Sequence, residues 1–124
     1  MSKSPPPSSS TDRDRLPVST RTGLRSSVVI AAYNADRSLA ETLDSLEVQT
    51  LRPHEIIVVD DGSTDRTSEI ANDHAIDVTL IRTPNRGMCA ARNEGIEASS
   101  GELICILDAD DLWHPRYVER MTSM

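Results

Sequence analysis

The chain has 124 residues, which is enough for one domain of the common size and too few for two. Its formal net charge is -7 and its isoelectric point is about 4.8, which excludes the broad basic surface that nucleic-acid-binding proteins present. No apolar stretch reaches the ~20 residues of a transmembrane helix, and the amino terminus lacks the apolar core of a signal peptide. We therefore expect a cytoplasmic protein with no transmembrane segment and no nucleic-acid partner.

Residues 1–25 differ in composition from the rest of the chain. They contain three consecutive prolines, a run of four hydroxyl residues and few apolar residues. Burial therefore cannot offset the conformational entropy that this segment would lose on ordering. We interpret residues 1–25 as a disordered tail rich in Pro and Ser, and residues 26–124 as a single folded domain.

Strands and helices are predicted to alternate through this domain. Short runs rich in β-branched residues, such as 28–32 and 55–59, are typical of strands that are buried on both faces of a parallel sheet. Leu39, Leu43 and Leu46 recur at the spacing of one helix face. In chain order the predicted elements are a strand over 28–32, a helix over 39–49, a strand over 55–59, a helix over 65–75, a strand over 77–81, a helix over 88–98, a strand over 103–107 and a helix from residue 115.

This order of elements indicates an α/β fold. Strand–helix–strand units connect parallel strands by crossovers, which places helices on both faces of the sheet. We therefore predict a doubly wound, mostly parallel sheet of the Rossmann-like, nucleotide-binding type.

Two of the predicted strands end abruptly in clusters of carboxylates. Asp60 and Asp61 follow the strand over 55–59, and the segment 108–110 follows the strand over 103–107. Parallel strands bring their carboxyl ends to one edge of the sheet, where open α/β sheets bind ligands, so we expect the clusters to meet there. Like charges repel unless a cation or a fixed donor compensates them, and hard divalent cations prefer carboxylate oxygen. The pattern predicts a metal-assisted phosphate or sugar site.

Short motifs in a fixed order cover nearly the whole chain from Ser27 onward. They lie at 28–34, 49–50, 58–65, 85–87, 90–93 and 107–111. In this order and spacing they resemble the nucleotide-binding half of the GT-A fold in family 2 glycosyltransferases. Ala31 stands where many members of that family have Pro or Thr. The resemblance implies inverting, hexosyltransferase-like transfer from a nucleotide diphosphate sugar, with a UDP-sugar as the expected donor.

The resemblance also implies which residues hold the nucleoside of the donor. Asp60 and Asp61 match the acid pair at the end of the second strand, where an aspartate accepts a hydrogen bond from the nucleobase, usually uracil. Tyr33 matches an aromatic position beside that base.

The diphosphate is assigned to a second group of residues. Asp108, Ala109 and Asp110 match the DxD motif, in which the first carboxylate approaches the ribose and the last one binds Mg²⁺ or Mn²⁺ between the donor phosphates. Ala109 is small, which lets the backbone approach the ligand. For Arg86 and Arg92 two roles remain open, because each could hold a phosphate or pair with one of the aspartates.

Other polar and aromatic residues have simpler interpretations. Asp65 is expected to cap a helix, and Asp111 to be a solvated loop residue. The histidines at 54, 74 and 114 share no spacing and are interpreted as surface residues. Trp113 is expected to anchor the last helix against the sheet rather than to stack on a sugar.

The chain ends soon after the second carboxylate cluster. The family's catalytic base lies in the second half of the domain, and no residue here matches it. We therefore expect the donor-binding part of a C-terminally incomplete GT-A fold, whose acceptor would be a glycan or a lipid-linked sugar. The alternative is a non-catalytic nucleotide-sugar-binding module or remnant. An uncovered sheet edge beyond 103–107 predicts self-association or a complementing chain.

Overall fold

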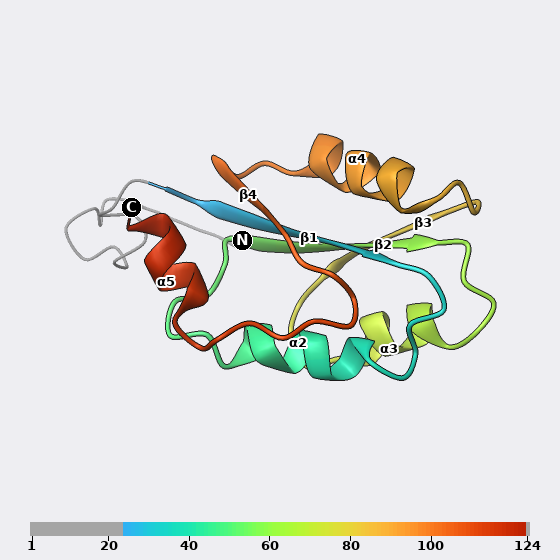
Figure 1. Ribbon diagram of the computed structural model, residues 1–124, viewed down its shortest axis with the longest axis horizontal. Helices are drawn as coiled ribbons and strands as arrows, with labels where there is room; N and C mark the ends of the chain where they lie inside the picture. Colours follow the sequence, from blue (N-terminus) through green and yellow to red (C-terminus); the bar gives the residue numbers. More distant parts are fainter. Residues whose placement is uncertain (1–23, 124) are drawn as a thin grey trace, which may run out of the picture.

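The computed structural model describes residues 24–123, so nearly all of the predicted tail lies outside the described residues. Within the described part, four strands alternate with helices and a last helix follows β4 (Figure 1). The strands are β1 (Ser26–Ala32), β2 (Glu55–Asp61), β3 (Thr79–Thr83) and β4 (Leu103–Ile106). The helices are α2 (Leu39–Glu47), α3 (Thr67–Asp73), α4 (Met88–Ala98) and α5 (Tyr117–Thr122).

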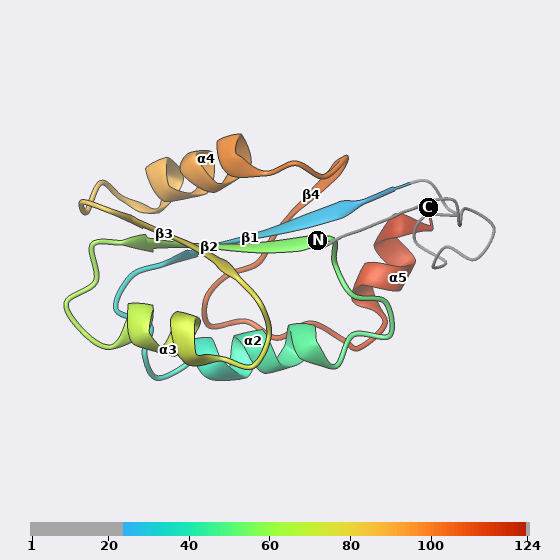
Figure 2. The same ribbon diagram turned by 180° about the vertical axis from the view of Figure 1, so that it is seen from behind.

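The four strands form one parallel sheet in the order β3-β2-β1-β4. Val28 of β1 pairs with Ile56 on one side and with Cys105 on the other. Helices α2 and α3 cover one face of the sheet and α4 covers the opposite face, as the two opposed views show (Figures 1 and 2). The predicted doubly wound parallel sheet is therefore confirmed.

The core lies on both faces of β1 and β2, because these strands are central and covered on each side. Val28 and Ile30 face α2 and α3, whereas Ala31 faces α4. Burying a large aliphatic side chain completely stabilises a fold by roughly 1.5–3 kcal/mol, so this double layer is the main source of stability. Helix α4 comes close to the sheet at Gly95, where a Cβ atom would collide with the side chain of Val29.

The boundaries of all four predicted strands need correction. Strand β1 begins at Ser26 instead of residue 28, and β4 ends at Ile106 instead of residue 107. Strand β2 extends through Asp60 and Asp61, because its ladder continues with Ala32 of β1 and Thr83 of β3. Strand β3 covers Thr79–Thr83 instead of 77–81, because its pairing with β2 begins only where Thr79 lies opposite Ile57.

The start of the domain is fixed by the backbone of Arg25, which the sequence assigned to the tail. Its carbonyl oxygen accepts hydrogen bonds from the N–H groups of Glu102 at 2.7 Å and Leu103 at 3.1 Å. Its own N–H group donates to the Glu102 carboxylate at 3.0 Å. Arg25 therefore extends the contact between β1 and β4 by one residue.

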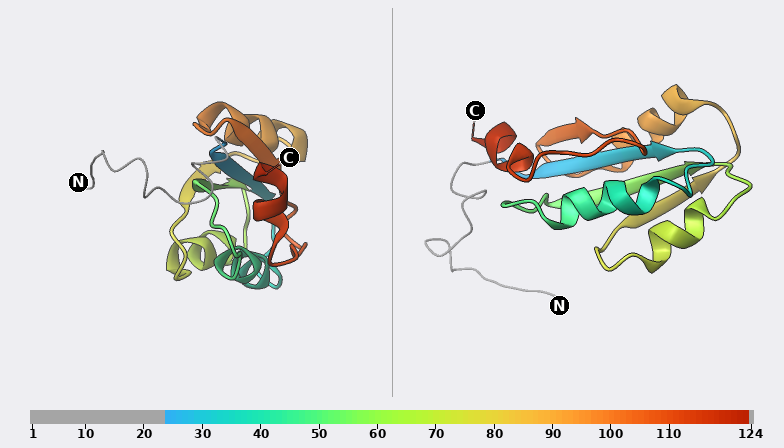
Figure 3. Two further views of the ribbon diagram at one scale, coloured as in Figure 1. Left: turned by 90° about the vertical axis from the view of Figure 1, so that its left-hand side faces the viewer. Right: turned by 60° about the horizontal axis from the view of Figure 1, so that its bottom comes forward.

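After β4 the chain turns back along α2 and ends in α5, which lies near the amino ends of the strands (Figure 3). Trp113 on this return segment stacks on Tyr117, with 4.1 Å between the ring centroids, and packs against the core. This confirms the predicted anchoring role of Trp113. In the part of the chain that the structure describes, no helix is long and apolar enough to cross a membrane.

Candidate functional site

A cavity of about 320 Å³ opens at the carboxyl ends of β1 and β4. Its position agrees with the sheet edge at which the sequence predicted a ligand site. Five predicted site residues line it, namely Tyr33, Arg92, Asp108, Ala109 and Asp110. Ser38 of the loop before α2 and Met88 of α4 also contribute to its wall.

Arg92 of α4 pairs with Asp108, with 3.3 Å between a guanidinium nitrogen and a carboxylate oxygen. Both side chains are exposed at the cavity, and exposed ion pairs of this kind stabilise a fold by about 1 kcal/mol or less. The structure thus shows one of the two roles that the sequence left open for Arg92. Because the pair is weak, an incoming phosphate could compete for the guanidinium at little energetic cost.

The backbone of the segment 108–110 is held by hydroxyl groups that the sequence analysis did not single out. The carbonyl oxygen of Ala109 accepts hydrogen bonds from the hydroxyls of Ser38 at 2.8 Å and Thr42 at 3.0 Å. Thr42 is fully buried among apolar residues of α2. A polar residue at a core-facing position of an amphipathic helix was the one sequence signal that could have indicated this role.

Asp110 is exposed at the cavity, and among the described residues its carboxylate has no hydrogen-bond or ion-pair partner. Mg²⁺ is commonly bound by one or two carboxylates together with phosphate oxygens of the substrate. Asp108 offers a second carboxylate two residues away on the same cavity wall. The residues present therefore fit a divalent cation that is shared with a bound phosphate.

Asp60 and Asp61 lie at the same edge of the sheet but do not line this cavity. Both carboxylate clusters therefore lie at the predicted edge, but β1 separates β2 from β4 and only the segment 108–110 lines the cavity. Asp60 and Asp61 are both only 1% exposed. Fixed backbone and hydroxyl donors compensate their charges.

The donors to Asp60 come from the β2–α3 connection and from the first turn of α3. Its carboxylate accepts hydrogen bonds from the backbone N–H of Ser63 at 2.9 Å and from the hydroxyl of Ser68. The donors to Asp61 come from a different loop. Its two oxygens accept the backbone N–H groups of Arg86 at 2.8 Å and Gly87 at 2.9 Å.

Asp61 thereby fixes the start of α4, the helix that carries Arg92. Gly87 precedes the first helical residue with a φ of 104°, a conformation that glycine adopts without strain. We call the two hydrogen bonds from the backbone N–H groups of Arg86 and Gly87 to Asp61 the clamp. The side chain of Arg86 is exposed, and only its backbone takes part in the clamp. A position for Arg86 at the cavity remains a prediction.

Tyr33 lies on a segment that is tied to the β2–α3 connection. The next residue, Asn34, has a positive φ of 49°, which Asn tolerates better than most residues. Its side-chain oxygen accepts the N–H of Thr64 at 2.9 Å, and its own N–H donates to the hydroxyl of Ser63 at 2.8 Å. These bonds hold the exposed ring of Tyr33 beside the cavity.

Asp65 belongs to the same connection. Helix α3 begins at Thr67, with Arg66 in the cap position that the sequence gave to Asp65. The carboxylate of Asp65 nevertheless accepts the N–H of Thr67 at 2.9 Å and that of Asp36 at 3.2 Å. Partial burial opposes ionisation of Asp65, but the hydrogen bonds from Thr67 and Asp36 outweigh it, so the pKa of Asp65 lies below its ordinary value.

Among the described residues, a different group has the geometry to hold a metal ion: Asp44, Glu47 and His74, whose ligand atoms lie within 4.8 Å of one another. His74 is not a surface residue as expected, because its side chain is 9% exposed. Its Nδ1 atom accepts the N–H of Ile76 at 3.0 Å, and its Nε2 atom lies 2.7 Å from Asp44.

These contacts determine which ring nitrogen carries the proton when His74 is neutral. Since Nδ1 accepts a hydrogen bond, the proton of the neutral ring is on Nε2, which donates to Asp44. A histidine that binds metal through Nε2 normally carries its proton on Nδ1. In His74 that proton would face the backbone N–H of Ile76, which is also a donor. We therefore interpret this group as a hydrogen-bonded contact between α2 and the end of α3. It does not include Asp110, the predicted metal ligand.

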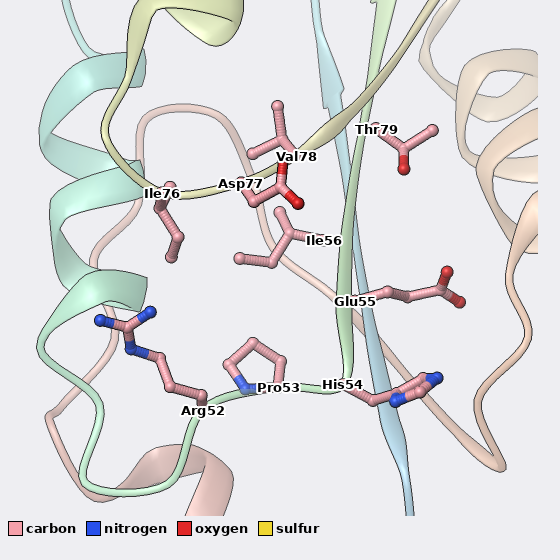
Figure 4. Close-up of a pocket in the computed structure, with 9 residues that line it drawn as sticks. All are labelled: Arg52, Pro53, His54, Glu55, Ile56, Ile76, Asp77, Val78 and Thr79. Carbon is pink, nitrogen blue, oxygen red and sulfur yellow. The ribbon is translucent and has the colours of Figure 1, made fainter. Parts of the chain in front are cut away.

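A second cavity, of about 220 Å³, lies at the amino ends of β2 and β3 (Figure 4). Ile56 and Ile76 point toward each other across it, whereas Glu55 points to the other side of β2. Glu55 accepts hydrogen bonds from the hydroxyls of Ser27 at 2.6 Å and Ser100 at 3.1 Å. Its carboxylate is thus used to hold the loop before β4, and this end of the sheet is a weaker candidate for a ligand site.

The family described as "Glycosyl transferase family 2" matches this chain over residues 27–124. The chain belongs to glycosyltransferase family 2. The amylovoran biosynthesis glycosyltransferase AmsB of Erwinia amylovora is 39% identical over 105 residues, which cover 79% of this chain and 35% of AmsB. Members of family 2 that are similar to this chain are thus much longer than it is.

Two solved structures have a similar fold. S. aureus TarS 1–349 in complex with UDP-GlcNAc has a TM-score of 0.70 and 27% identity, covering 80% of this chain and 30% of that chain. The mannosyltransferase PcManGT of Pyrobaculum calidifontis, in complex with GDP-Man and Mn²⁺, has a TM-score of 0.71 and 31% identity, covering 81% and 31%. The chain therefore spans about a third of the length of these relatives.

Proposed function

We propose that this family 2 domain binds a nucleotide diphosphate sugar, with a UDP-sugar as the preferred donor, together with Mg²⁺ or Mn²⁺. The observation that carries the proposal is the single cavity that Tyr33, Arg92, Asp108 and Asp110 share at the carboxyl edge of the sheet. The complexes of TarS with UDP-GlcNAc and of PcManGT with GDP-Man and Mn²⁺ support the ligand class. Since those nucleotides differ, the preference for uracil is part of the proposal.

Each side chain in the cavity has a role that suits its chemistry. Asp110 holds the cation, and Asp108 accepts hydrogen bonds from the ribose hydroxyls. Arg92 moves from Asp108 to the diphosphate, where two negative groups attract it more strongly than one exposed carboxylate. Tyr33, whose ring is half exposed, stacks beside the nucleobase.

We also propose that Asp60 or Asp61 accepts a hydrogen bond from the base. An ionised carboxylate has about four acceptor sites. The two backbone donors to Asp61 leave further lone pairs on its oxygens. The base contact would use one of these, so it requires that the clamp on the segment 86–87 remains in place.

In the proposed reaction the bond between the anomeric carbon and the nucleoside diphosphate breaks, and the sugar is transferred, with inversion, to a hydroxyl of a glycan or a lipid-linked acceptor. A bound cation would act as a Lewis acid that neutralises charge on the departing diphosphate. Arg92 would add a second positive charge on the α4 side of the cavity. The oriented cavity wall, fixed through Ala109, would hold the anomeric carbon in one position relative to the acceptor.

A second candidate function is nucleotide-sugar binding without transfer. Asp108 and Asp110 are the carboxylates that line the cavity, and both are assigned to the donor. Transfer also needs a base at the attacking hydroxyl of the acceptor. We propose that the 124-residue chain alone binds the donor but transfers no sugar, and at most hydrolyses it slowly.

The binding proposal is tested by calorimetric titration of UDP in the presence of Mn²⁺, Mg²⁺ or a chelator. We expect binding only with a metal ion, and Asp110→Asn should weaken it at least tenfold, about 1.4 kcal/mol. Asp111→Asn is the matched control, because Asp111 is an exposed neighbour that does not line the cavity. Equal UDP affinity with and without the chelator would contradict the metal role, and tighter binding of GDP would contradict the preference for uracil.

The transfer proposal needs a separate assay. The chain is incubated with UDP-sugars, metal ion and a panel of glycan and lipid-linked acceptors, while UDP release and product mass are followed. We expect no glycosylated product. Efficient transfer would show that the chain contains its own base, and Asp111, His114 and Glu119 would be the first candidates.

A further inference from the structure

The β1–α2 loop (33–38) and the β2–α3 connection (62–66) run side by side on the way to their helices (Figure 1). Three consecutive backbone N–H groups of the first loop, those of residues 34–36, all donate to side-chain oxygens of the connection or of the first residue of α3. The pairs are Asn34 with Ser63 at 2.8 Å, Ala35 with Thr67 at 2.9 Å and Asp36 with Asp65 at 3.2 Å. These side chains therefore determine where the backbone of the β1–α2 loop lies.

The contact between the two segments is reciprocal. The side-chain oxygen of Asn34 accepts the N–H of Thr64 at 2.9 Å, and the carboxylate of Asp36 accepts the N–H of Arg66 at 3.4 Å. Each segment thus supplies both backbone donors and side-chain acceptors to the other. Movement of one segment would break hydrogen bonds to the other.

Thr67 links the two segments most directly. Its side chain is fully buried, and its hydroxyl accepts the N–H of Ala35 while donating to the carboxylate of Asp65 at 2.5 Å. A hydroxyl can do both, because it has one donor and two acceptor sites. The carbonyl oxygen of Ala35 accepts the N–H groups of Ser38 at 3.1 Å and Leu39 at 2.9 Å, where α2 begins. Ala35 is therefore fixed on both sides.

The segment that is held in this way forms one wall of the candidate cavity. Its lining residues are Tyr33, Asn34, Ala35 and Ser38. Asp65 and Thr67 do not line the cavity. They can therefore influence a ligand only through the backbone that they hold, and this backbone carries the ring assigned to the nucleobase.

The wall assigned to the cation and the diphosphate is held by other bonds. The carbonyl oxygen of Ala109 accepts the hydroxyl of Thr42 at 3.0 Å, and the N–H of Leu107 donates to Val29 of β1 at 3.0 Å. Neither bond involves the β2–α3 connection. The segment 108–110 therefore keeps its place when the bonds to Thr67 are removed.

We propose that Thr67 and Asp65 are positioning residues for the nucleobase of the donor. They fix the backbone of residues 34–36, and through it they hold the ring of Tyr33 in the place where it contacts the base. A wall that is already ordered loses less conformational entropy when the ligand binds, so affinity for the base is higher. The inference rests on the proposed binding of a nucleotide diphosphate sugar and adds two residues outside the cavity that set its affinity.

The proposal is tested by calorimetric titration of the full 124-residue chain with UDP and with inorganic pyrophosphate, each in the presence of Mn²⁺. Thr67→Val keeps the shape of the side chain but leaves the N–H of Ala35 without its acceptor. We expect UDP affinity to fall roughly fivefold or more, the factor that one hydrogen bond contributes, and pyrophosphate affinity to change less than about twofold. Thr67→Ser, which keeps the hydroxyl, should retain the affinity for UDP.

Thr122→Val is the matched control for the loss of a buried hydroxyl. Thr122 is 1% exposed, and its hydroxyl donates to the carbonyl oxygen of Val118 at 2.9 Å within α5, away from the cavity. This variant should be less stable in urea but bind UDP unchanged.

Ser63→Ala provides a milder second variant, because it removes only the acceptor of Asn34 and keeps the backbone bond from Ser63 to Asp60. It should also weaken UDP more than pyrophosphate. Circular dichroism checks that each variant folds.

The ratio of the two affinities separates positioning of the base from a general structural role. Equal UDP affinity of Thr67→Val and the unmodified chain overturns the inference, and so do parallel losses for UDP and pyrophosphate. In both cases the unmodified chain still binds UDP, so the proposed function stands. An unmodified chain that does not bind UDP contradicts the proposed function and this inference together.

Discussion

The buried hydroxyl of Thr42 donates a hydrogen bond to the carbonyl oxygen of Ala109, with 3.0 Å between the two oxygens. This bond joins α2 to the segment that carries Asp108 and Asp110. The side chains of a cavity wall can be positioned only if the backbone beneath them is fixed. The contact therefore connects a residue of the core with the geometry of the candidate site.

Replacing Thr42 by Val keeps the shape of the side chain and removes this donor. We expect Thr42→Val to lower the free energy of unfolding by about 1 kcal/mol, the usual net contribution of one hydrogen bond. UDP binding in the presence of Mn²⁺ should also weaken several-fold, because the backbone of Ala109 is held less firmly. Thr42→Ser, which keeps the hydroxyl, should retain the affinity. Unchanged binding by Thr42→Val would show that Ser38 alone is sufficient to fix the segment.

Removing the carboxylate of Asp61 is expected to cause a large loss of stability. Asp61→Ala leaves the N–H groups of Arg86 and Gly87 without their acceptor, and each unsatisfied group costs about 1–3 kcal/mol when buried. Urea unfolding should show that the free energy of unfolding decreases by about 2–4 kcal/mol. Asp111→Ala, at an exposed position, should remain within about 0.5 kcal/mol of the unmodified chain. A small effect at Asp61 would mean that water replaces the carboxylate at these amides.

The milder change Asp61→Asn keeps one of the two acceptors for the loop and weakens the proposed base contact. Its amide oxygen can accept one of the two backbone N–H groups, while its NH2 group faces the other, and an amide oxygen is a weaker acceptor than a carboxylate toward the N–H of a base. UDP should bind more weakly, whereas inorganic pyrophosphate, which has no base, should bind unchanged. Parallel losses for both ligands in calorimetry would assign the effect to displacement of α4 and Arg92.

Gln49 connects α2 to the segment that leads into α5. Its side-chain nitrogen donates to the carbonyl oxygens of Ser45 at 3.0 Å and His114 at 2.8 Å, and its oxygen accepts the N–H of Val118 at 3.0 Å. Gln49→Ala should lower the free energy of unfolding by about 2 kcal/mol or more, because three hydrogen bonds to a buried side chain are lost.

The single tryptophan of the chain, Trp113, reports on this region. We expect Gln49→Ala to shift its fluorescence to longer wavelength, as the segment before α5 loosens and water reaches the indole. Arg52→Ala, at an exposed position three residues after Gln49, should leave the spectrum unchanged. An unaltered spectrum of Gln49→Ala would show that the stacking of Trp113 on Tyr117 holds the segment without help.

Glu55 predicts a specific dependence of stability on pH. Partial burial opposes its ionisation, but hydrogen bonds from Ser27 and Ser100 outweigh this, so the pKa of Glu55 is lowered from its ordinary value of 4.5. The ionised carboxylate therefore contributes stability that is fully present above pH 4.5 and is lost as the pH falls through the lower pKa of the folded state.

Glu55→Gln should be less stable than the unmodified chain at neutral pH. The difference between the two should shrink as the pH is lowered from about 6 to about 3, because the unmodified carboxyl becomes protonated. Thermal unfolding across this range measures the effect. Glu97→Gln, at an exposed position of α4, should show a difference that changes little with pH. A constant difference for Glu55→Gln would contradict a contribution from its ionisation.

Much of the fold could be predicted from local patterns. Runs such as Val58-Val59 are apolar on both faces, which indicates a buried parallel strand, and the leucines of α2 mark one helix face. Parallel strands fix which ends meet, so the edge that holds Asp108 and Asp110 followed from the element order alone. The boundaries of β2 and β3 did not follow, because they depend on ladder pairing between segments that are distant in sequence.

The candidate site, too, could be predicted only in part from the sequence. The sequence alone determined that carboxylates follow two strands and that Asp108 and Asp110 flank a small residue. Only the tertiary structure decided that β1 separates the two carboxylate clusters. It also decided that backbone N–H groups of a distant loop donate hydrogen bonds to Asp61, and that Arg92 pairs with Asp108. The physical reason is that strand order and hydrogen-bond partners are set by long-range packing, which local periodicity does not encode.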